Sequence, residues 1–79
     1  MNIMEIVNNV NEELEEIGDF KAHYEDDNIW IKNTEQSDIL AFELKHILDL
    51  MKKYNYKFHA IEHYQGKCWL VFGMGGYIK

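Results

Sequence analysis

The sequence has no arginine and no proline, and its 79 residues include one cysteine, Cys68. One cysteine excludes an internal disulfide, and without arginine the chain lacks the side chain that most often reads guanine or clamps phosphate. No apolar run follows a basic start, and no apolar stretch is long enough to span a bilayer. These absences favour a soluble cytoplasmic protein that does not bind nucleic acid directly and does not enter a membrane.

Acidic residues are concentrated towards the amino terminus, and this imbalance is the strongest functional signal in the sequence. The first 28 residues hold nine acids against one lysine, and the whole chain has a net charge of −6. A dense negative surface selects positively charged partners and repels nucleic acid. The nine acids are Glu5, Glu12, Glu13, Glu15, Glu16, Asp19, Glu25, Asp26 and Asp27.

The length of the chain predicts one small domain over residues 1 to 79. A domain of this size buries only about 60 to 65% of its unfolded surface, so partner binding or a homodimer would add stability. The glycine-containing end, residues 73 to 79, is expected to be a loose tail.

Apolar residues at spacings of three and four predict an amphipathic helix from about residue 3 to residue 17. Asn2 and Glu5 have the spacing of a capping box, and Gly18 suits the left-handed position after the last turn. Four glutamates crowd the carboxyl-terminal half, where the helix dipole is already negative. Such conflicts with local preference often mark functional sites.

Residues 19 to 33 alternate in polarity around Asp26, Asp27 and Asn28, which predicts a β-hairpin with its turn at these three residues. Trp30 would then face away from the core. The side chains expected to face the core are Phe20, Ala22, Tyr24, Ile29 and Ile31.

A second helix is expected from an N-cap at Thr34 to about Tyr54, with acids in its first turn and lysines in its last. Three apolar residues, Ile39, Phe42 and Leu50, lie outside its main apolar face. A helix that is apolar over more than half its circumference is normally covered on two sides, by the sheet and by another helix or another chain.

Residues 56 to 72 predict a second hairpin with its turn at Gln65 and Gly66. Both faces carry apolar groups, so the buried face stays open. The expected cross-strand pairs are His63 with Cys68, Ile61 with Leu70, His59 with Phe72, Glu62 with Trp69, and Ala60 with Val71. The order α-β-β-α-β-β predicts an α+β domain, in which two helices back a four-stranded, mainly antiparallel sheet of undetermined strand order.

Three patterns suggest chemistry without completing a site. His59, Glu62 and His63 spell the H-x-x-E-H signature of a zinc protease, but they lie in a segment that alternates like a strand. His59, His63 and Cys68 on one strand face would suit zinc but lack a fourth ligand, and a Cys68 nucleophile would lack an oxyanion hole. We therefore predict no catalytic residue, no metal site and no cofactor.

One further pattern concerns single-stranded nucleic acid. Lys21, His23, Trp30 and Lys32 form a basic and aromatic strand face of the kind on which bases stack, although the net charge opposes this interpretation. The alternative is that Trp30 and Trp69 anchor a protein interface.

The favoured hypothesis is a small non-enzymatic module that binds another protein, as an inhibitor or regulator. Its acids, from the first helix and the first hairpin turn, would form one continuous patch that mimics phosphates in a basic nucleic-acid-binding surface of the partner. Phage-encoded inhibitors of host defence, including anti-CRISPR proteins, provide a functional analogy. The predicted partner-binding residues are Glu12, Glu13, Glu15, Glu16, Asp19, Glu25, Asp26, Asp27, Trp30 and Trp69.

Two alternatives stay open. The acids can serve solubility alone, as most charged helix faces do. The protein can also be a structural homodimer or a complex subunit whose interface is the second helix or an open sheet face.

Overall fold

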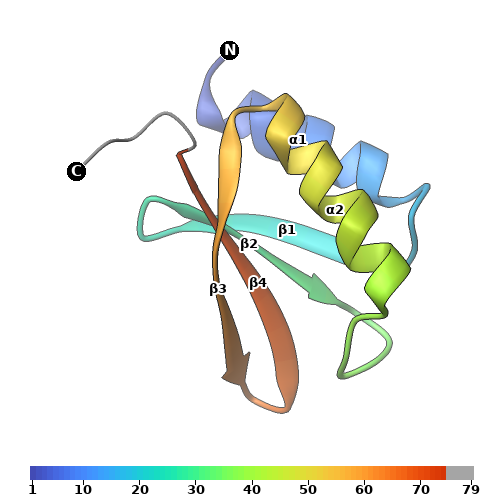
Figure 1. The fold of residues 1–79 in the computed structure, drawn as a ribbon. Coiled ribbons are helices and arrows are strands. Elements are labelled where there is room, and N and C mark those ends of the chain that lie inside the picture. The colour runs from blue at the N-terminus through green and yellow to red at the C-terminus, as the bar shows by residue number, and fades with distance from the viewer. Residues whose placement is uncertain (75–79) are drawn as a thin grey trace.

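The structure, a computed structural model, describes residues 1–74. Its four strands form one antiparallel sheet in the order β1-β2-β4-β3, which confirms the predicted α+β fold (Figure 1). Of the predicted loose tail, residues 73 and 74 belong to the last strand, and residues 75 to 79 lie outside the described residues. The elements are α1 (Ile3–Leu14), β1 (Phe20–Glu25), β2 (Asn28–Asn33), α2 (Ala41–Lys53), β3 (Tyr56–Tyr64) and β4 (Lys67–Met74).

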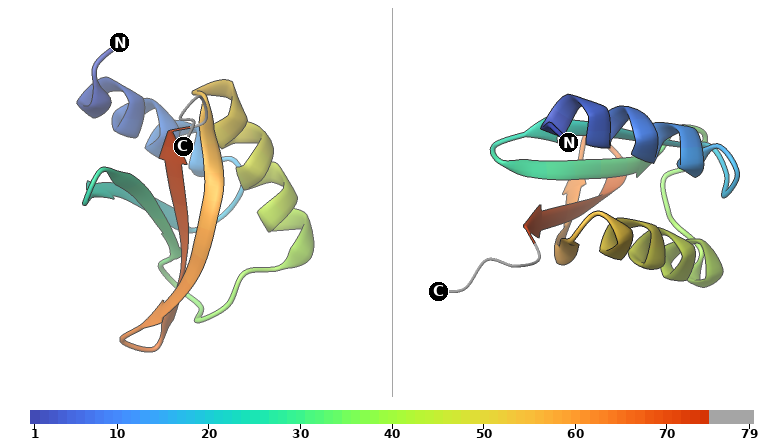
Figure 2. Two further views of the ribbon diagram at one scale, coloured as in Figure 1. Left: turned by 60° about the vertical axis from the view of Figure 1, so that its left-hand side comes forward. Right: turned by 90° about the horizontal axis from the view of Figure 1, so that it is seen from above.

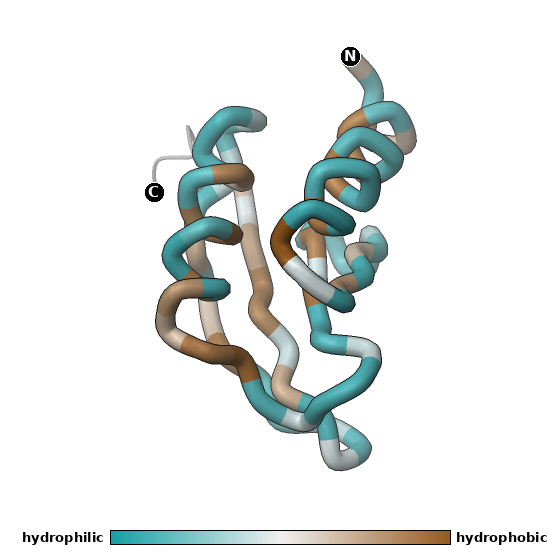
Figure 3. The backbone as a smooth tube through the Cα atoms, turned by 90° about the vertical axis from the view of Figure 1, so that its right-hand side faces the viewer, coloured by the Kyte–Doolittle hydropathy of each residue, from teal (hydrophilic) through white to brown (hydrophobic). Residues whose placement is uncertain are grey.

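Both helices lie on the same face of the sheet, α1 against β1 and α2 against β3 (Figure 2). Polar residues predominate on the outer turns of both helices, whereas the first turn of α2 is more hydrophobic (Figure 3). No element among residues 1–74 covers the other face, which we call the open face. The buried core between helices and sheet consists of Val7, Val10, Leu14, Phe20, Ala22, Ile29, Ile31, Ile47, Leu50, Met51, Tyr56, Leu70 and Phe72.

The amino-terminal end of α1 confirms the predicted capping box. The Asn2 side chain accepts a hydrogen bond of 2.9 Å from the Glu5 N–H, and the Glu5 carboxylate accepts one of 2.9 Å from the Asn2 N–H. The helix ends at Leu14, three residues earlier than expected, and a turn continues to Gly18. The prediction that Gly18 adopts a left-handed conformation is wrong, because its φ is not positive. A Cβ at this position would lie 3.0 Å from the ring of Phe20, so close packing accounts for the glycine.

Asn11 joins α1 to the edge strand β1. Its side-chain amide donates to the carbonyl oxygen of Ala22 at 3.1 Å, and its side-chain oxygen accepts from the N–H of Ala22 at 2.8 Å. A neighbouring strand would bond to the N–H and C=O of Ala22 in the same way. Asn11 therefore satisfies two backbone groups on the free edge of β1.

The first hairpin is confirmed, with Asp26 and Asp27 alone in its turn and Asn28 already in β2. Both turn residues have positive φ, 53° and 66°, as a two-residue turn between twisted strands requires. The core position predicted for Tyr24 is wrong, because this side chain is 41% exposed. Its phenol hydroxyl lies at the sheet edge and donates to the Asp27 carboxylate at 3.2 Å.

The second helix begins at Ala41, not after Thr34, so the predicted N-cap is wrong. The Asn33 side chain already accepts hydrogen bonds of 2.8 Å from the two N–H groups that follow Thr34. Thr34 itself donates both its N–H and its hydroxyl to the carbonyl oxygen of Asp19. These bonds hold a loop where a helix would otherwise begin.

The residues predicted on a second apolar side of this helix are covered mostly from within the chain, and one of them, Ile39, precedes α2 in the structure. Leu50 is buried, and Ile39 is half-buried against the core. Phe42 is 60% exposed. Of the three residues that suggested an external cover, only Phe42 is thus available for one.

The second hairpin turns at Gln65 and Gly66, as predicted. The pair of His59 with Phe72 is wrong, because a bulge between Phe58 and Ala60 places Phe58 opposite Phe72. Leu70 and Phe72 of β4 belong to the buried core, whereas Trp69 lies on the open face, which identifies the inner face of this hairpin. The confirmed pairs are His63 with Cys68, Ile61 with Leu70, Glu62 with Trp69, and Ala60 with Val71.

Candidate partner-binding surface

The glutamates at the end of α1 are not equivalent. Glu12, Glu15 and Glu16 are exposed. Glu13 instead forms an ion pair with Lys53 on α2, and its second oxygen accepts a hydrogen bond of 2.6 Å from the Tyr54 hydroxyl. The chain's own groups therefore neutralise Glu13, one of the predicted partner-binding acids. These contacts also join the end of α1 to the end of α2.

The hydrogen bonds from Lys53 and Tyr54 stabilise the charged form of Glu13 and lower the pKa of its carboxyl group. The same contact raises the pKa of Tyr54 to about 12, because the carboxylate favours the neutral phenol. Glu13 is thus part of the fold, not of the surface offered to a partner.

We expect Glu13→Gln to lower the free energy of unfolding at pH 7 by about 0.5 to 1 kcal/mol, a value discounted for solvent exposure. A carboxyl whose pKa is lowered in the folded state stabilises that state above its unfolded pKa and loses this contribution as the pH falls. The difference between the two proteins should therefore shrink towards pH 3. Urea denaturation at both pH values measures it, and an equal difference at pH 3 and pH 7 would contradict this account.

The acids of the first hairpin turn lie at the opposite end of β1 from the end of α1 (Figure 1). β1 has six residues, so about 20 Å of strand separates Asp19 from Asp26. The expectation of one continuous acidic patch is therefore wrong. The structure divides the acids into a helix group (Glu12, Glu15, Glu16 and Asp19) and a turn group (Glu25, Asp26 and Asp27).

Aromatic side chains from three strands gather on the open face. Trp30 of β2 and Trp69 of β4 meet edge to face with ring centroids 6.2 Å apart. His23 of β1 stacks on Trp30 at 6.4 Å and meets Trp69 edge to face at 5.2 Å. The pairing of β2 with β4 brings the two tryptophans together, and Trp30 faces away from the core as predicted.

Hydrogen bonds fix this aromatic cluster to the first hairpin turn. The Trp30 indole N–H donates to the carbonyl oxygen of Glu25 at 3.1 Å, and the Glu25 carboxylate lies 3.0 Å from Nε2 of His23. The Lys32 ammonium lies 5.0 Å from the centre of the Trp69 ring. One face of Trp69 thus already holds a cation.

Next to the cluster is a pocket of about 270 Å³, which we call the aromatic–acidic pocket. Its lining combines indole rings with carboxylates of the turn group and of β3. Indole faces and carboxylates both attract cations, so the pocket suits an ammonium or guanidinium group. It is lined by His23, Glu25, Asp26, Trp30, Glu62, His63, Tyr64 and Trp69.

Trp69 is not fully satisfied within the protein. Its indole N–H is buried and has no hydrogen-bond partner among residues 1–74. A buried donor without an acceptor costs about 1 to 3 kcal/mol. The aromatic cluster therefore retains an unfavourable feature, as functional surfaces often do.

The pocket unites four of the predicted partner-binding residues, Glu25, Asp26, Trp30 and Trp69, and leaves the helix group elsewhere. The predicted list omitted His23, Glu62, His63 and Tyr64. Two of the four had a signal in the sequence: the predicted pairing of Glu62 with Trp69, and the alternation that places His23 and Trp30 on one strand face. The missing information was that β2 and β4 are neighbours.

The alternatives that involve metal or thiol chemistry gain no support. Among the described residues, no group of three His, Cys, Asp or Glu side chains is arranged to hold a metal ion. His59, Glu62 and His63 lie on a strand, without the helical spacing that the protease signature needs. Burial, with a smaller effect of the Asp38 carboxylate, raises the pKa of the Cys68 thiol, which opposes formation of the nucleophilic thiolate.

Comparison with known proteins gives no assignment: no protein-family model, curated protein or solved structure matches the chain. Neither α1 nor α2, the helices of residues 1–74, has the length and apolarity of a membrane span.

Proposed function

We propose that this protein is a small non-enzymatic module that binds basic side chains of another protein. The observation that carries the proposal is the aromatic–acidic pocket, where three carboxylates and two indole rings line one hollow of the open face. A lysine or arginine side chain would meet both opposite charge and the negative face of an aromatic ring there. Aromatic anchors commonly supply most of the binding energy of an interface.

The helix group has a different role in this proposal. With a net charge of −6, the protein attracts a basic partner over a distance of about one Debye length, roughly 8 to 10 Å. Exposed charges at the rim of an interface mainly raise the association rate. Glu12, Glu15 and Glu16 would therefore speed the encounter, whereas the pocket would hold the partner.

The partner surface that this module fits best is one that otherwise binds nucleic acid, because such surfaces concentrate lysine and arginine. Bound there, the carboxylates would occupy the positions of backbone phosphates, and the module would act as an inhibitor or regulator. Phage-encoded inhibitors of host defence, including anti-CRISPR proteins, are the analogy for this mode. Its setting would be the cytoplasm, consistent with a single unpaired cysteine.

Two triple variants with equal net charge test the proposal. The pocket variant carries Glu25→Gln, Asp26→Asn and Glu62→Gln, and the helix variant carries Glu12→Gln, Glu15→Gln and Glu16→Gln. Asparagine suits position 26, because it tolerates the positive φ of Asp26. A partner captured on the immobilised wild-type protein is identified and purified, and its affinity for all three proteins is measured at several salt concentrations.

We expect the pocket variant to bind about a hundredfold more weakly than wild type, and the helix variant to lose less than about tenfold, mainly through slower association. Wild type, but not the pocket variant, should also displace nucleic acid from the partner. Equal losses in both variants would show that only net charge matters and would refute the pocket as the binding site.

A further inference from the structure

Strand β3 forms a free edge of the sheet, because it pairs only with β4 among residues 1–74. It is nine residues long, and three of its large apolar side chains are exposed: Phe58 at 44%, Ile61 at 48% and Tyr64 at 60%. A long edge strand with exposed apolar groups offers unpaired N–H and C=O groups to a further strand. Figure 2 shows β3 on the outer side of its hairpin with β4.

The bulge in β3 changes which side chains share a face. Phe58 is opposite Phe72 and Ile61 is opposite Leu70, so both lie on the face that the helices cover. Lys57 is opposite Gly73 and Glu62 is opposite Trp69, which places both on the open face. In a regular strand Phe58 and Ile61 would point to opposite faces, because side chains alternate.

We propose that β3 pairs antiparallel with β3 of a second copy of this chain, about a two-fold axis between His59 and Ala60. In this register Lys57 is opposite Glu62 of the second copy, and Phe58 is opposite Ile61 of the second copy. The symmetry repeats each contact, so the interface gains two ion pairs and two apolar pairs. One continuous sheet then runs through both copies.

The bulge favours a second copy over an unrelated strand. A bulge normally protects an edge, because its extra residue has no counterpart on a regular strand. In the symmetric pair the two bulges face one another, so their spacing matches. Shifting the register by one residue would set side chains of opposite faces against each other, for example Lys57 against Ile61.

Sedimentation equilibrium of the full chain from about 10 to 200 µM tests this pairing. We expect a monomer–dimer equilibrium whose dissociation constant rises about tenfold in Lys57→Glu and in Glu62→Lys, because each reversal turns two attractive cross-strand contacts repulsive. The double variant Lys57→Glu/Glu62→Lys should restore the wild-type constant. Both positions are exposed, so circular dichroism should show unchanged folding.

The control is Phe42→Ala, which removes the exposed aromatic side chain of α2 and should leave the dimer unchanged. A wild-type monomer at the highest concentration, a double variant as weak as the single ones, or a dimer lost in Phe42→Ala would each overturn the proposal. Glu62 also lines the aromatic–acidic pocket, but sedimentation without a partner reports self-association alone. Absence of the dimer would therefore overturn the β3 pairing and leave the proposed function intact.

Discussion

Replacing Trp30 with alanine should weaken binding of the basic partner by about a hundredfold, the effect of losing a central aromatic anchor. Trp30 contributes the ring that stacks with His23 and packs against Trp69, and its indole N–H holds the carbonyl oxygen of Glu25. The substitution therefore removes a wall of the pocket and loosens one of its acids. Titration calorimetry with the purified partner measures the loss.

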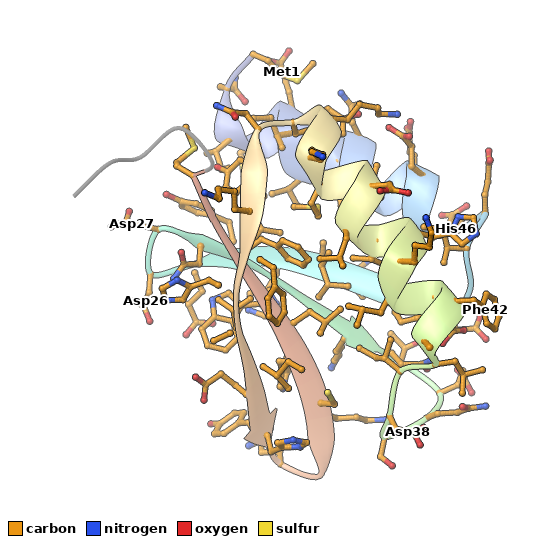
Figure 4. All side chains as sticks on the ribbon, viewed as in Figure 1. Met1, Asp26, Asp27, Asp38, Phe42 and His46 are labelled. Carbon is orange, nitrogen blue, oxygen red and sulfur yellow. The ribbon has the colours of Figure 1, made fainter. Side chains whose placement is uncertain are left out.

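The control is Phe42→Ala, which removes an exposed aromatic side chain from the first turn of α2, outside the aromatic–acidic pocket. Figure 4 shows Phe42 at the start of α2, far from Asp26 and Asp27 at the hairpin turn. We expect its affinity for the partner to equal that of wild type. If Phe42→Ala binds weakly and Trp30→Ala binds normally, the interface is the second helix and the rival hypothesis is correct.

Asn11→Ala should lower the free energy of unfolding by about 2 kcal/mol, because it leaves the N–H and C=O of Ala22 without their partners. Ala22 is 3% exposed, and in the folded protein its outward N–H and C=O groups bond to Asn11. For a domain of this size the loss corresponds to a fall in melting temperature of roughly 8 to 16 °C. Thermal and urea denaturation measure it.

Asn8→Ala serves as the control, because Asn8 is an exposed residue on the same helix. It should change stability by less than about 0.5 kcal/mol. Equal stabilities of Asn8→Ala and Asn11→Ala would mean that the side-chain bonds to Ala22 do not support the edge of the sheet.

Local features of the fold followed from the sequence, because their signals lie within a few residues of one another. The capping box of Asn2 and Glu5 depends on side chains next to the backbone groups that they bind, and each tight turn depends on two adjacent residues with positive φ. Alternation predicted both hairpins for the same reason. The start of α2 was mispredicted because Asn33 and Thr34 form bonds in the structure that compete with a helix cap.

The candidate site depended on long-range pairing, which no local pattern encodes. Trp30 and Trp69 are far apart in the chain, and they meet only because β2 lies beside β4. The single acidic patch was mispredicted for the converse reason. Its acids are close in sequence, but the length of β1 separates the helix group from the turn group. The bulge between Phe58 and Ala60, which removes His59 from its predicted pair, was also not predicted, because the alternation of the sequence assumes a regular strand.

The most direct test of the account is a nuclear magnetic resonance titration of the ¹⁵N-labelled protein with a short lysine- and arginine-containing peptide. Each tryptophan has one indole N–H resonance, so Trp30 and Trp69 report on the aromatic–acidic pocket separately from the amides of α1. We predict that both indole resonances shift with the basic peptide and not with its glutamine-substituted analogue. Shifts confined to the amides of Glu12, Glu15 and Glu16, with the indole resonances unmoved, would contradict the account.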